Sequence, residues 1–396
     1  MGIFKILFLL RSFLVSGFNA LWKNKFLFEG FDFTKISSVM SIKLTLSTVL
    51  DFPTGILADR FGYKICALTG FGIIGIGFTV PLFIQADAWG LGACILLVGI
   101  GSAIVNGALD AWAAYTQDQS EAGIESKKFA ARDSFQKIGS ALSAIVFLVG
   151  TGLMTGNLRW VWFTFALASW ILFALACLAP EERGGKVHRK SRRLAKVGSH
   201  FISVWKLPAL QLMAINGFLF GCCDGLRGAV YWSRMKDLGL TDWLGLGVLQ
   251  IINYLSWVLG LQIWSASGRM ESKTVAGEAL LFGATLGIVF AWITNPNLAL
   301  ATWILRTIVL SAYFAGLQNM ILRLTPAADI RASMLAGNSL LYSIGMIVAT
   351  GLAGFFGSEG QESLWLTVGM VAGLVGGLLL IRANRIATGQ ATSSDG

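Results

Sequence analysis

Twelve apolar stretches, each long enough to cross a bilayer, follow one another along this chain of 396 residues. A helix of about 20 residues rises roughly 30 Å, which is the thickness of membrane hydrocarbon. Only 13% of the residues are charged, against about a quarter in soluble domains, so an ordinary cytosolic enzyme is excluded. We predict an all-α membrane protein with spans at about 4–22, 36–58, 65–85, 90–115, 133–154, 160–179, 207–230, 242–265, 275–294, 298–322, 332–356 and 363–381.

Basic residues near the span ends predict the orientation of the chain, because Lys and Arg collect on the cytoplasmic side of a membrane. With both termini inside, most Lys and Arg residues of the loops fall on that side, eight of them between Arg183 and Lys206. This basic loop is expected to contact anionic lipid rather than nucleic acid. We therefore expect a multi-pass protein of a bacterial cell inner membrane with cytoplasmic termini.

The two halves of the chain resemble each other. A shift of 199 positions places 132–153 (RDSFQKIGSALSAIVFLVGTGL) over 331–352 (RASMLAGNSLLYSIGMIVATGL), with nine identities in the 22 aligned positions. The repeat maps span five onto span eleven and span one onto span seven in the same direction, as in transporters built from parallel repeats. We predict an N-terminal six-helix bundle at 1–180, a basic cytoplasmic linker at 181–206, a C-terminal six-helix bundle at 207–382 and a cytoplasmic tail at 383–396.

A motif joins the predicted second and third spans: Gly55-Ile-Leu-Ala-Asp59-Arg60-Phe-Gly62-Tyr-Lys64. It resembles the signature G-x-L-A-D-R-x-G-x-K of the major facilitator superfamily (MFS). Asp51-Phe-Pro-Thr before it, and Asn106-Gly-Ala-Leu-Asp110-Ala-Trp112, are similar to the E-x-P-T-G and S-G-A-x-E-A-W patterns of a prokaryotic branch of drug and metabolite carriers. The resemblance implies the MFS fold, with twelve transmembrane helices in two pseudo-symmetric six-helix bundles.

The signature loop suits a conformational role. Gly62 permits a tight turn, while Arg60 and Lys64 can bind carboxylates or the carbonyl groups that end a helix. The resemblance implies that such contacts latch the outward-open state. The residues that we assign to gating are Asp51, Asp59, Arg60, Gly62, Lys64, Arg132, Asp224, Arg227 and Arg331, and Lys43, Asp51 and Lys137 are expected to form a network between spans two and five.

Charges inside the spans are costly in hydrocarbon and normally face a cavity or each other. Their distribution is uneven, because spans one, four, seven and ten carry Arg11, Asp110, Asp224 with Arg227, and Arg306, whereas spans three, six and twelve carry none. The resemblance implies that helices one, four, seven and ten line a central cavity. Polar and aromatic residues at helical spacing extend the same faces. The predicted cavity residues are Arg11, Asn19, Asn106, Asp110, Gln250, Tyr254, Trp257, Arg306, Tyr313, Asn338 and Tyr342.

Asp110 is the candidate for proton coupling, because a carboxyl group in a cavity of low dielectric can titrate as a solute binds. The alternative is a permanent ion pair with Arg11 that fixes helix packing. Arg11 and Arg306 can instead meet an anionic group of the solute. Asp224 and Arg227, three residues apart, favour mutual pairing or outer gating.

Other signals do not indicate a cofactor. The G-x-G-x-x-G pattern at 70–75 lies within an apolar span, where helix packing explains it better than a nucleotide. The two histidines lie in the basic loop without metal-ligand spacing, and the five cysteines lack paired spacing. No cofactor or metal is expected.

We predict a monomeric secondary transporter that works by alternating access, with a small organic solute and protons as its partners. Proton-coupled efflux of drug-like compounds or metabolites, by antiport, is the first expectation. Span four has no basic residue, and span five lacks the G-P-x-x-G-G-like pattern usual in drug/proton antiporters of the superfamily. The alternatives are uptake or exchange of an organic anion such as a siderophore or a carboxylate, and a polytopic lipid-modifying enzyme.

Overall fold

The computed structural model describes residues 2–28, 33–83, 88–116, 125–153, 158–180, 207–269, 272, 274–324, 331–358 and 360–393. Several side chains inside these ranges lie outside the description, among them those of Asp51, Asp59, Arg60, Asn106, Asp110 and Arg331. All regular structure in the described part is helical.

The first half of the chain forms six helices, and the second half forms seven within the described ranges. The helices of the first half are α1 (Gly2–Phe28), α2 (Phe33–Phe61), α3 (Tyr63–Phe83), α4 (Ala88–Thr116), α5 (Glu125–Leu153) and α6 (Leu158–Leu178). Those of the second half are α8 (Pro208–Asp237), α9 (Leu240–Ala266), α10 (Val275–Trp292), α11 (Pro296–Leu310), α12 (Ala312–Leu324), α13 (Arg331–Phe356) and α14 (Glu362–Ser393).

These helices confirm the twelve predicted spans, because α11 and α12 together make the tenth span, divided at Ser311. Most helices extend beyond the predicted apolar core, and α14 continues past residue 381 into the predicted tail. Eight described helices meet a membrane-span criterion of length and hydropathy. The helix ends lie beyond the predicted spans because hydropathy marks only the apolar middle of a helix, whereas the helical backbone continues into the polar sequence on either side.

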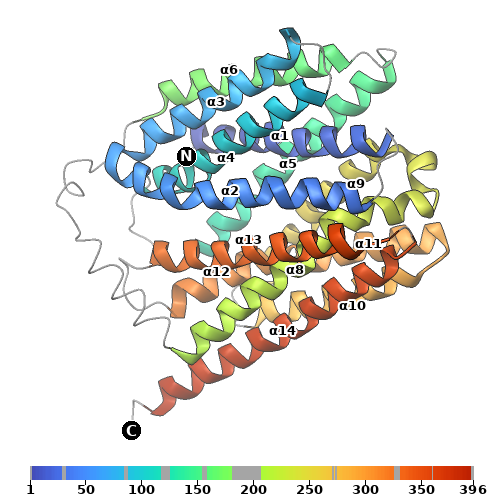
Figure 1. The fold of residues 1–396 in the computed structure, drawn as a ribbon. Helices are drawn as coiled ribbons and strands as arrows, with labels where there is room; N and C mark the ends of the chain where they lie inside the picture. The colour runs from blue at the N-terminus through green and yellow to red at the C-terminus, as the bar shows by residue number, and fades with distance from the viewer. Residues whose placement is uncertain are drawn as a thin grey trace.

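The helices gather into two bundles (Figure 1). Helices α1 to α6 lie together, and α8 to α14 lie together beside them. Within the bundles α1 packs on α5 and α8 packs on α13, which is the correspondence that the sequence repeat predicts. Between the bundles α2 packs on α13 and α5 packs on α9. In the repeat α2 corresponds to α9 and α5 corresponds to α13. The two contacts are therefore related to each other by pseudo-twofold symmetry.

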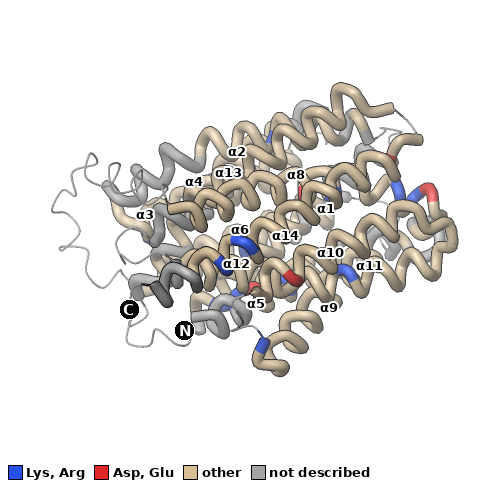
Figure 2. Tube along the Cα trace, turned by 90° about the horizontal axis from the view of Figure 1, so that it is seen from below, with Lys and Arg blue, Asp and Glu red and all other residues tan. Residues whose placement is uncertain are grey.

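The outward surface of both bundles is apolar. Figure 2 shows few charged residues along the described lengths of the helices. Large side chains such as Phe83, Leu178 and Phe355 are exposed, which suits contact with lipid tails. The solvent of this surface is therefore a bilayer rather than water.

Glycines set the closest helix contacts. A Cβ added to Gly70 would lie 2.8 Å from the Gly101 carbonyl oxygen, and one added to Gly101 would lie 2.7 Å from the Gly70 carbonyl oxygen, so α3 and α4 touch backbone to backbone. The glycine pattern at 70–75 thus serves helix packing, as predicted.

Candidate functional site

The turn between α2 and α3 shows what the signature loop does locally. Only Gly62 separates the two helices, and its φ of 100° is a backbone conformation that glycine adopts without strain. The Lys64 ammonium donates to the carbonyl oxygens of Cys177 (3.1 Å) and Ala179 (2.7 Å) at the end of α6. Lys64 therefore binds helix C-terminal carbonyls, as predicted, but within its own bundle.

Trp257 of α9 contacts the first bundle through two described side chains of α5. Its indole N–H donates to the Asp133 carboxylate of α5 over 2.8 Å. One turn further along α5, the Lys137 ammonium lies 4.4 Å from the centre of the Trp257 ring. An ammonium over an indole face is an attractive cation–π contact. One aromatic side chain therefore joins a carboxylate and an ammonium of the opposite bundle.

A second contact between the bundles runs through hydroxyl groups. The Tyr254 side chain on α9 lies beside the Ser16 side chain on α1. Ser16 lies 2.8 Å from the Ser140 hydroxyl of α5, which is also 2.8 Å from the Ser12 hydroxyl. Tyr254 thus contacts a small polar surface that the serine hydroxyl groups of α1 and α5 form.

Aromatic rings line the second bundle near its mid-depth. The centres of the Phe220 and Tyr313 rings are 4.0 Å apart, and Phe220 stacks on Tyr342 at 5.7 Å. The Phe314 ring lies 6.2 Å from both Tyr342 and Trp257. We call these five residues, from α8, α9, α12 and α13, the aromatic wall: Phe220, Trp257, Tyr313, Phe314 and Tyr342.

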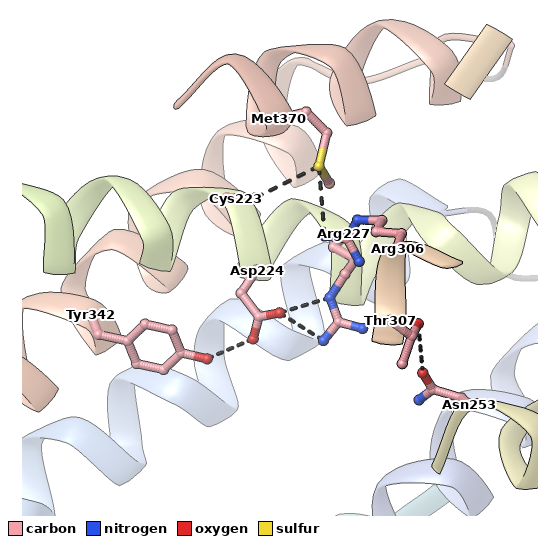
Figure 3. A network of polar contacts seen from close by, with 8 residues as sticks. All are labelled: Cys223, Asp224, Arg227, Asn253, Arg306, Thr307, Tyr342 and Met370. Atoms are coloured by element: carbon pink, nitrogen blue, oxygen red, sulfur yellow. Dashed lines mark hydrogen bonds and ion pairs between the residues drawn. The ribbon is translucent and has the colours of Figure 1, made fainter. Parts of the chain in front are cut away.

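A charged network lies beside the aromatic wall (Figure 3). The Asp224 carboxylate accepts from Arg227, one turn along α8, at 2.6 Å and 2.7 Å. Its second oxygen accepts from the Tyr342 hydroxyl of α13 at 2.6 Å. The predicted pairing of Asp224 with Arg227 is present, and Tyr342 ties it to the helix that packs on α2.

Arg306 of α11 lies deeper in the same bundle, with 3% of its surface exposed. Its guanidinium lies close to Arg227 and approaches the Met370 sulfur of α14 at 3.6 Å (Figure 3). Gly287 of α10 makes room for it, because a Cβ there would lie 3.0 Å from the Arg306 Nε atom. Tyr313 is likewise buried, and its hydroxyl accepts from Asn216. Both predicted cavity residues are therefore enclosed within the second bundle.

The other predicted residues take separate places. Lys43 donates to Asn19 of α1, whereas Lys137 contacts α9, so their described contacts do not form the expected network between spans two and five. Arg11 is half-buried on α1, and Gln250 is buried on α9. The Arg132 guanidinium lies 5.9 Å from the centre of the Phe8 ring of α1.

Asn338 is the remaining predicted site residue whose side chain the structure describes. Asn338 of α13 abuts α8, where a Cβ on Gly217 would lie 2.7 Å from its side-chain oxygen. The side chains of Asp51, Asp59, Arg60, Asn106, Asp110 and Arg331 lie outside the described residues. The assignments of these six residues therefore remain predictions.

Sequence reasoning missed Asp133, Ser16 and the phenylalanines of the aromatic wall. The sequence does contain a clue to Asp133. The repeat aligns it with Ala332, although the residues on either side of it are identical in the two halves. A carboxylate that one half has and the other lacks breaks the symmetry of the repeat. Nothing in the sequence pairs Asp133 with Trp257, since the two residues are 124 positions apart. Across the described residues no cluster of His, Cys, Asp or Glu could hold a metal ion.

Comparison with known proteins identifies the architecture. The sequence model of the Major Facilitator Superfamily matches residues 6–277, more than half of the chain. No functionally curated protein matches the chain significantly.

Solved transporter structures share the fold. A structure of the nucleoside transporter NupG has a TM-score of 0.67 at 17% identity, over 97% of this chain and 98% of that one. A POT family transporter in complex with 5-aminolevulinic acid has a TM-score of 0.73 at 15% identity, over 97% and 96%. A peptide transporter POT in complex with sulfate has a TM-score of 0.71 at 15% identity, over 97% and 95%. The chain therefore belongs to the Major Facilitator Superfamily, and it is a secondary transporter rather than an enzyme.

Proposed function

We propose that this transporter carries a small organic solute that combines a negative charge with an aromatic or apolar part. Lys137 is the observation that carries this proposal. Its ammonium lies near the middle of α5 against the opposite bundle, and among the described residues it forms no ion pair. A lysine at membrane depth is costly unless it serves a partner or a ligand. The Asp133 carboxylate one turn away is bonded to Trp257, so a carboxylate or phosphate group on the solute would supply the ion-pair partner that Lys137 lacks among the described residues.

The aromatic wall supports the second part of the proposal. Trp257 presents one ring to Lys137 and lies near Phe314, so the cation and the apolar surface adjoin. Solute sites commonly combine an apolar lining with a few polar groups that set the orientation. A solute bound between Lys137 and the wall would contact both bundles at once.

The same contacts support the proposal of alternating access. Rocking one bundle against the other opens a central site to each side in turn. The links from Trp257 to Asp133 and from Tyr254 to Ser16 cross the boundary that this motion must open. A bound solute that replaces these links would make their separation less costly.

Proton-coupled efflux from the cytoplasm remains our expectation for energy and direction, with Asp110 as the proton-coupling residue. Uptake or exchange of an organic anion, such as a siderophore or a carboxylate, is the competing assignment, and the position of Lys137 is compatible with it. We further propose a monomer in a bacterial inner membrane, with cytoplasmic termini and anionic lipid at the basic linker.

The solute class is tested with a matched pair of probes, 2-naphthoate and its neutral amide 2-naphthamide. Purified protein should be stabilised more by the carboxylate, because a ligand of the native state raises the melting temperature. Lys137→Gln should remove this preference, whereas Lys236→Gln, at an exposed position near the end of α8, should keep it. An equal response of the wild type to both probes, with no change in Lys137→Gln, would contradict the proposal.

Coupling needs a separate measurement in proteoliposomes. With Asp110→Asn, accumulation of 2-naphthoate driven by a pH gradient should stop, while exchange of the probe across the membrane continues. Gradient-driven accumulation at the wild-type rate would remove Asp110 from proton coupling. It would leave the assignment of Lys137 to solute binding intact.

A further inference from the structure

Among the buried hydrogen-bond donors of the second bundle that have no partner in the described residues, three belong to α8 and α11 and lie at most 3% exposed. They are the Arg306 Nε–H, the Tyr231 O–H and the Trp303 Nε1–H. An unsatisfied polar group in such a place costs roughly 1–3 kcal/mol, and more when it is charged. A ligand that accepts hydrogen bonds would remove this cost.

The three donors come from two helix faces that meet. Trp303 and Arg306 are one turn apart on α11, while Arg227 and Tyr231 are one turn apart on α8. The Tyr231 and Trp303 rings stack at 4.9 Å, which brings the faces together. Tyr231 also interacts electrostatically with the guanidinium groups of Arg227 and Arg306. The donors thus share one enclosed region between α8 and α11, flanked by α10 and α14.

The charges in this region do not balance. Asp224 is the described carboxylate nearby, and its two oxygens already accept from Arg227 and Tyr342. Arg306 forms no ion pair among the described residues, and its polar contact is the Met370 sulfur, a weak acceptor. Arg227 adds repulsion. One positive charge is therefore left over in a medium of low dielectric, where an uncompensated charge costs several kcal/mol.

We propose that Arg306, Tyr231 and Trp303 form a binding site for a small monovalent anion such as chloride. An anion accepts from all three donors and cancels the leftover charge. Water fits less well, because it is neutral and leaves the positive charge of Arg306 uncompensated. A carboxylate group shares the anion's chemistry, but the enclosure of Arg306 favours a small ion from the medium over the transported solute.

The site would act on the transport machinery through Arg227. Binding of an anion beside Arg306 relieves its repulsion with Arg227 and so stabilises the pair of Arg227 with Asp224. Asp224 in turn holds Tyr342 on α13, the helix that packs on α2 of the first bundle. The anion is thus a structural ligand of the second bundle, separate from the solute site at Lys137.

The test is the thermal stability of the purified full-length protein at constant ionic strength, with gluconate replaced by chloride. The melting temperature should rise by about 2–4 °C and saturate, because a ligand of the native state stabilises it. Bromide should act similarly. No difference between chloride and gluconate would overturn the proposal, and so would stabilisation by acetate without any by halide.

Three variants locate the site. Arg306→Met should abolish the chloride response. Tyr231→Phe removes one donor with little change of shape, and Trp303→Phe removes a second donor together with part of a buried ring, so each should raise the chloride concentration at half-effect by about tenfold. The control is Trp365→Phe, since the indole N–H of Trp365 is also buried without a described partner but lies near α13. An unchanged chloride response in both Trp303→Phe and Tyr231→Phe would refute the assignment, even if Arg306→Met fails to fold.

Discussion

The helix pairs α1–α5 and α8–α13 are related by the sequence repeat, yet different chemistry holds them together. In α8–α13, added Cβ atoms on Gly217, Gly221 and Gly225 would meet α13, so the backbones lie close together. In α1–α5, Gly139 makes the close approach, and the hydroxyls of Ser12, Ser16 and Ser140 bridge the helices.

Single repeat positions show how the two pairs diverged. The repeat matches Ser143 with Tyr342. The Ser143 hydroxyl bonds its own helix at the Ser140 carbonyl oxygen, whereas the Tyr342 hydroxyl crosses to Asp224 on α8. Both close packing and buried polar contacts hold helices together in membranes. A duplicated topology therefore keeps its helix pairing while the contacts that stabilise it change.

The largest expected effect comes from the ion pair of Asp224 with Arg227 on α8, which the Tyr342 hydroxyl links to α13. Asp224→Asn should destabilise the protein by about 3 kcal/mol, because it leaves Arg227 and Arg306 without a carboxylate. The melting temperature in detergent, followed by tryptophan fluorescence, measures the loss. Adding Arg227→Gln should recover part of it, and a melting temperature equal to that of the wild type in Asp224→Asn would show that the pair adds nothing to this interface.

Close packing of α8 on α13 should give the next effect. A Cβ at Gly221 would fall on the Tyr342 carbonyl oxygen, so Gly221→Ala must push the helices apart. We expect a loss of about 1–3 kcal/mol, measured by thermal unfolding. The control is Gly99→Ala on α4, because no atom lies within 4 Å of a Cβ there. Equal stability of the two variants would mean that glycine contact does not distinguish the helix pairs.

The serine bridge of α1–α5 should contribute less. Ser140→Ala removes the hydroxyl between Ser12 and Ser16 and should cost about 1 kcal/mol of unfolding free energy. The repeat matches Ser140 with Ser339, which is exposed, so Ser339→Ala should change stability by less than about 0.5 kcal/mol. Unfolding of both variants in one detergent compares the halves directly. A larger loss from Ser339→Ala would invert the comparison.

The smallest effect is expected at Asn338, which the repeat matches with Gly139. The Asn338 side-chain oxygen is buried without a partner among the described residues. Asn338→Ala should therefore change the unfolding free energy by no more than about 0.5 kcal/mol. Gly139→Ala should cost more, because its Cβ would fall on the Leu9 carbonyl oxygen. Melting temperatures that rank the two variants the other way would contradict the assigned packing.

Much of the fold was predictable from particular segments. The apolar run around 275–294 predicts α10, because a segment in lipid must satisfy its backbone within its own helix. Gly62 predicts the turn that joins α2 to α3, and the repeat predicts that α13 packs on α8 as α5 packs on α1. Lys64 was predicted to bind carboxylates or the carbonyl groups that end a helix, but the sequence does not reveal that its partners are carbonyl groups at the end of α6.

The candidate site was less predictable. Trp257, Tyr254 and Tyr342 were expected at the cavity from helical spacing, but their partners Asp133, Ser16 and Asp224 were not assigned to them. Arg306 was expected in the cavity because a charge in a span usually faces one, and the structure encloses it within the second bundle. Helical spacing places residues on one face, whereas the angle and depth of packing decide which neighbour that face meets.

The number of spans and the likeness of the two halves follow from the amino-acid sequence, because hydrophobicity, turn preference and repetition are properties of short or directly comparable segments. Only the tertiary structure determines that Lys137 contacts Trp257 and that Tyr342 contacts Asp224. These partners lie more than a hundred residues apart, and their contact depends on how rigid helices pack in three dimensions.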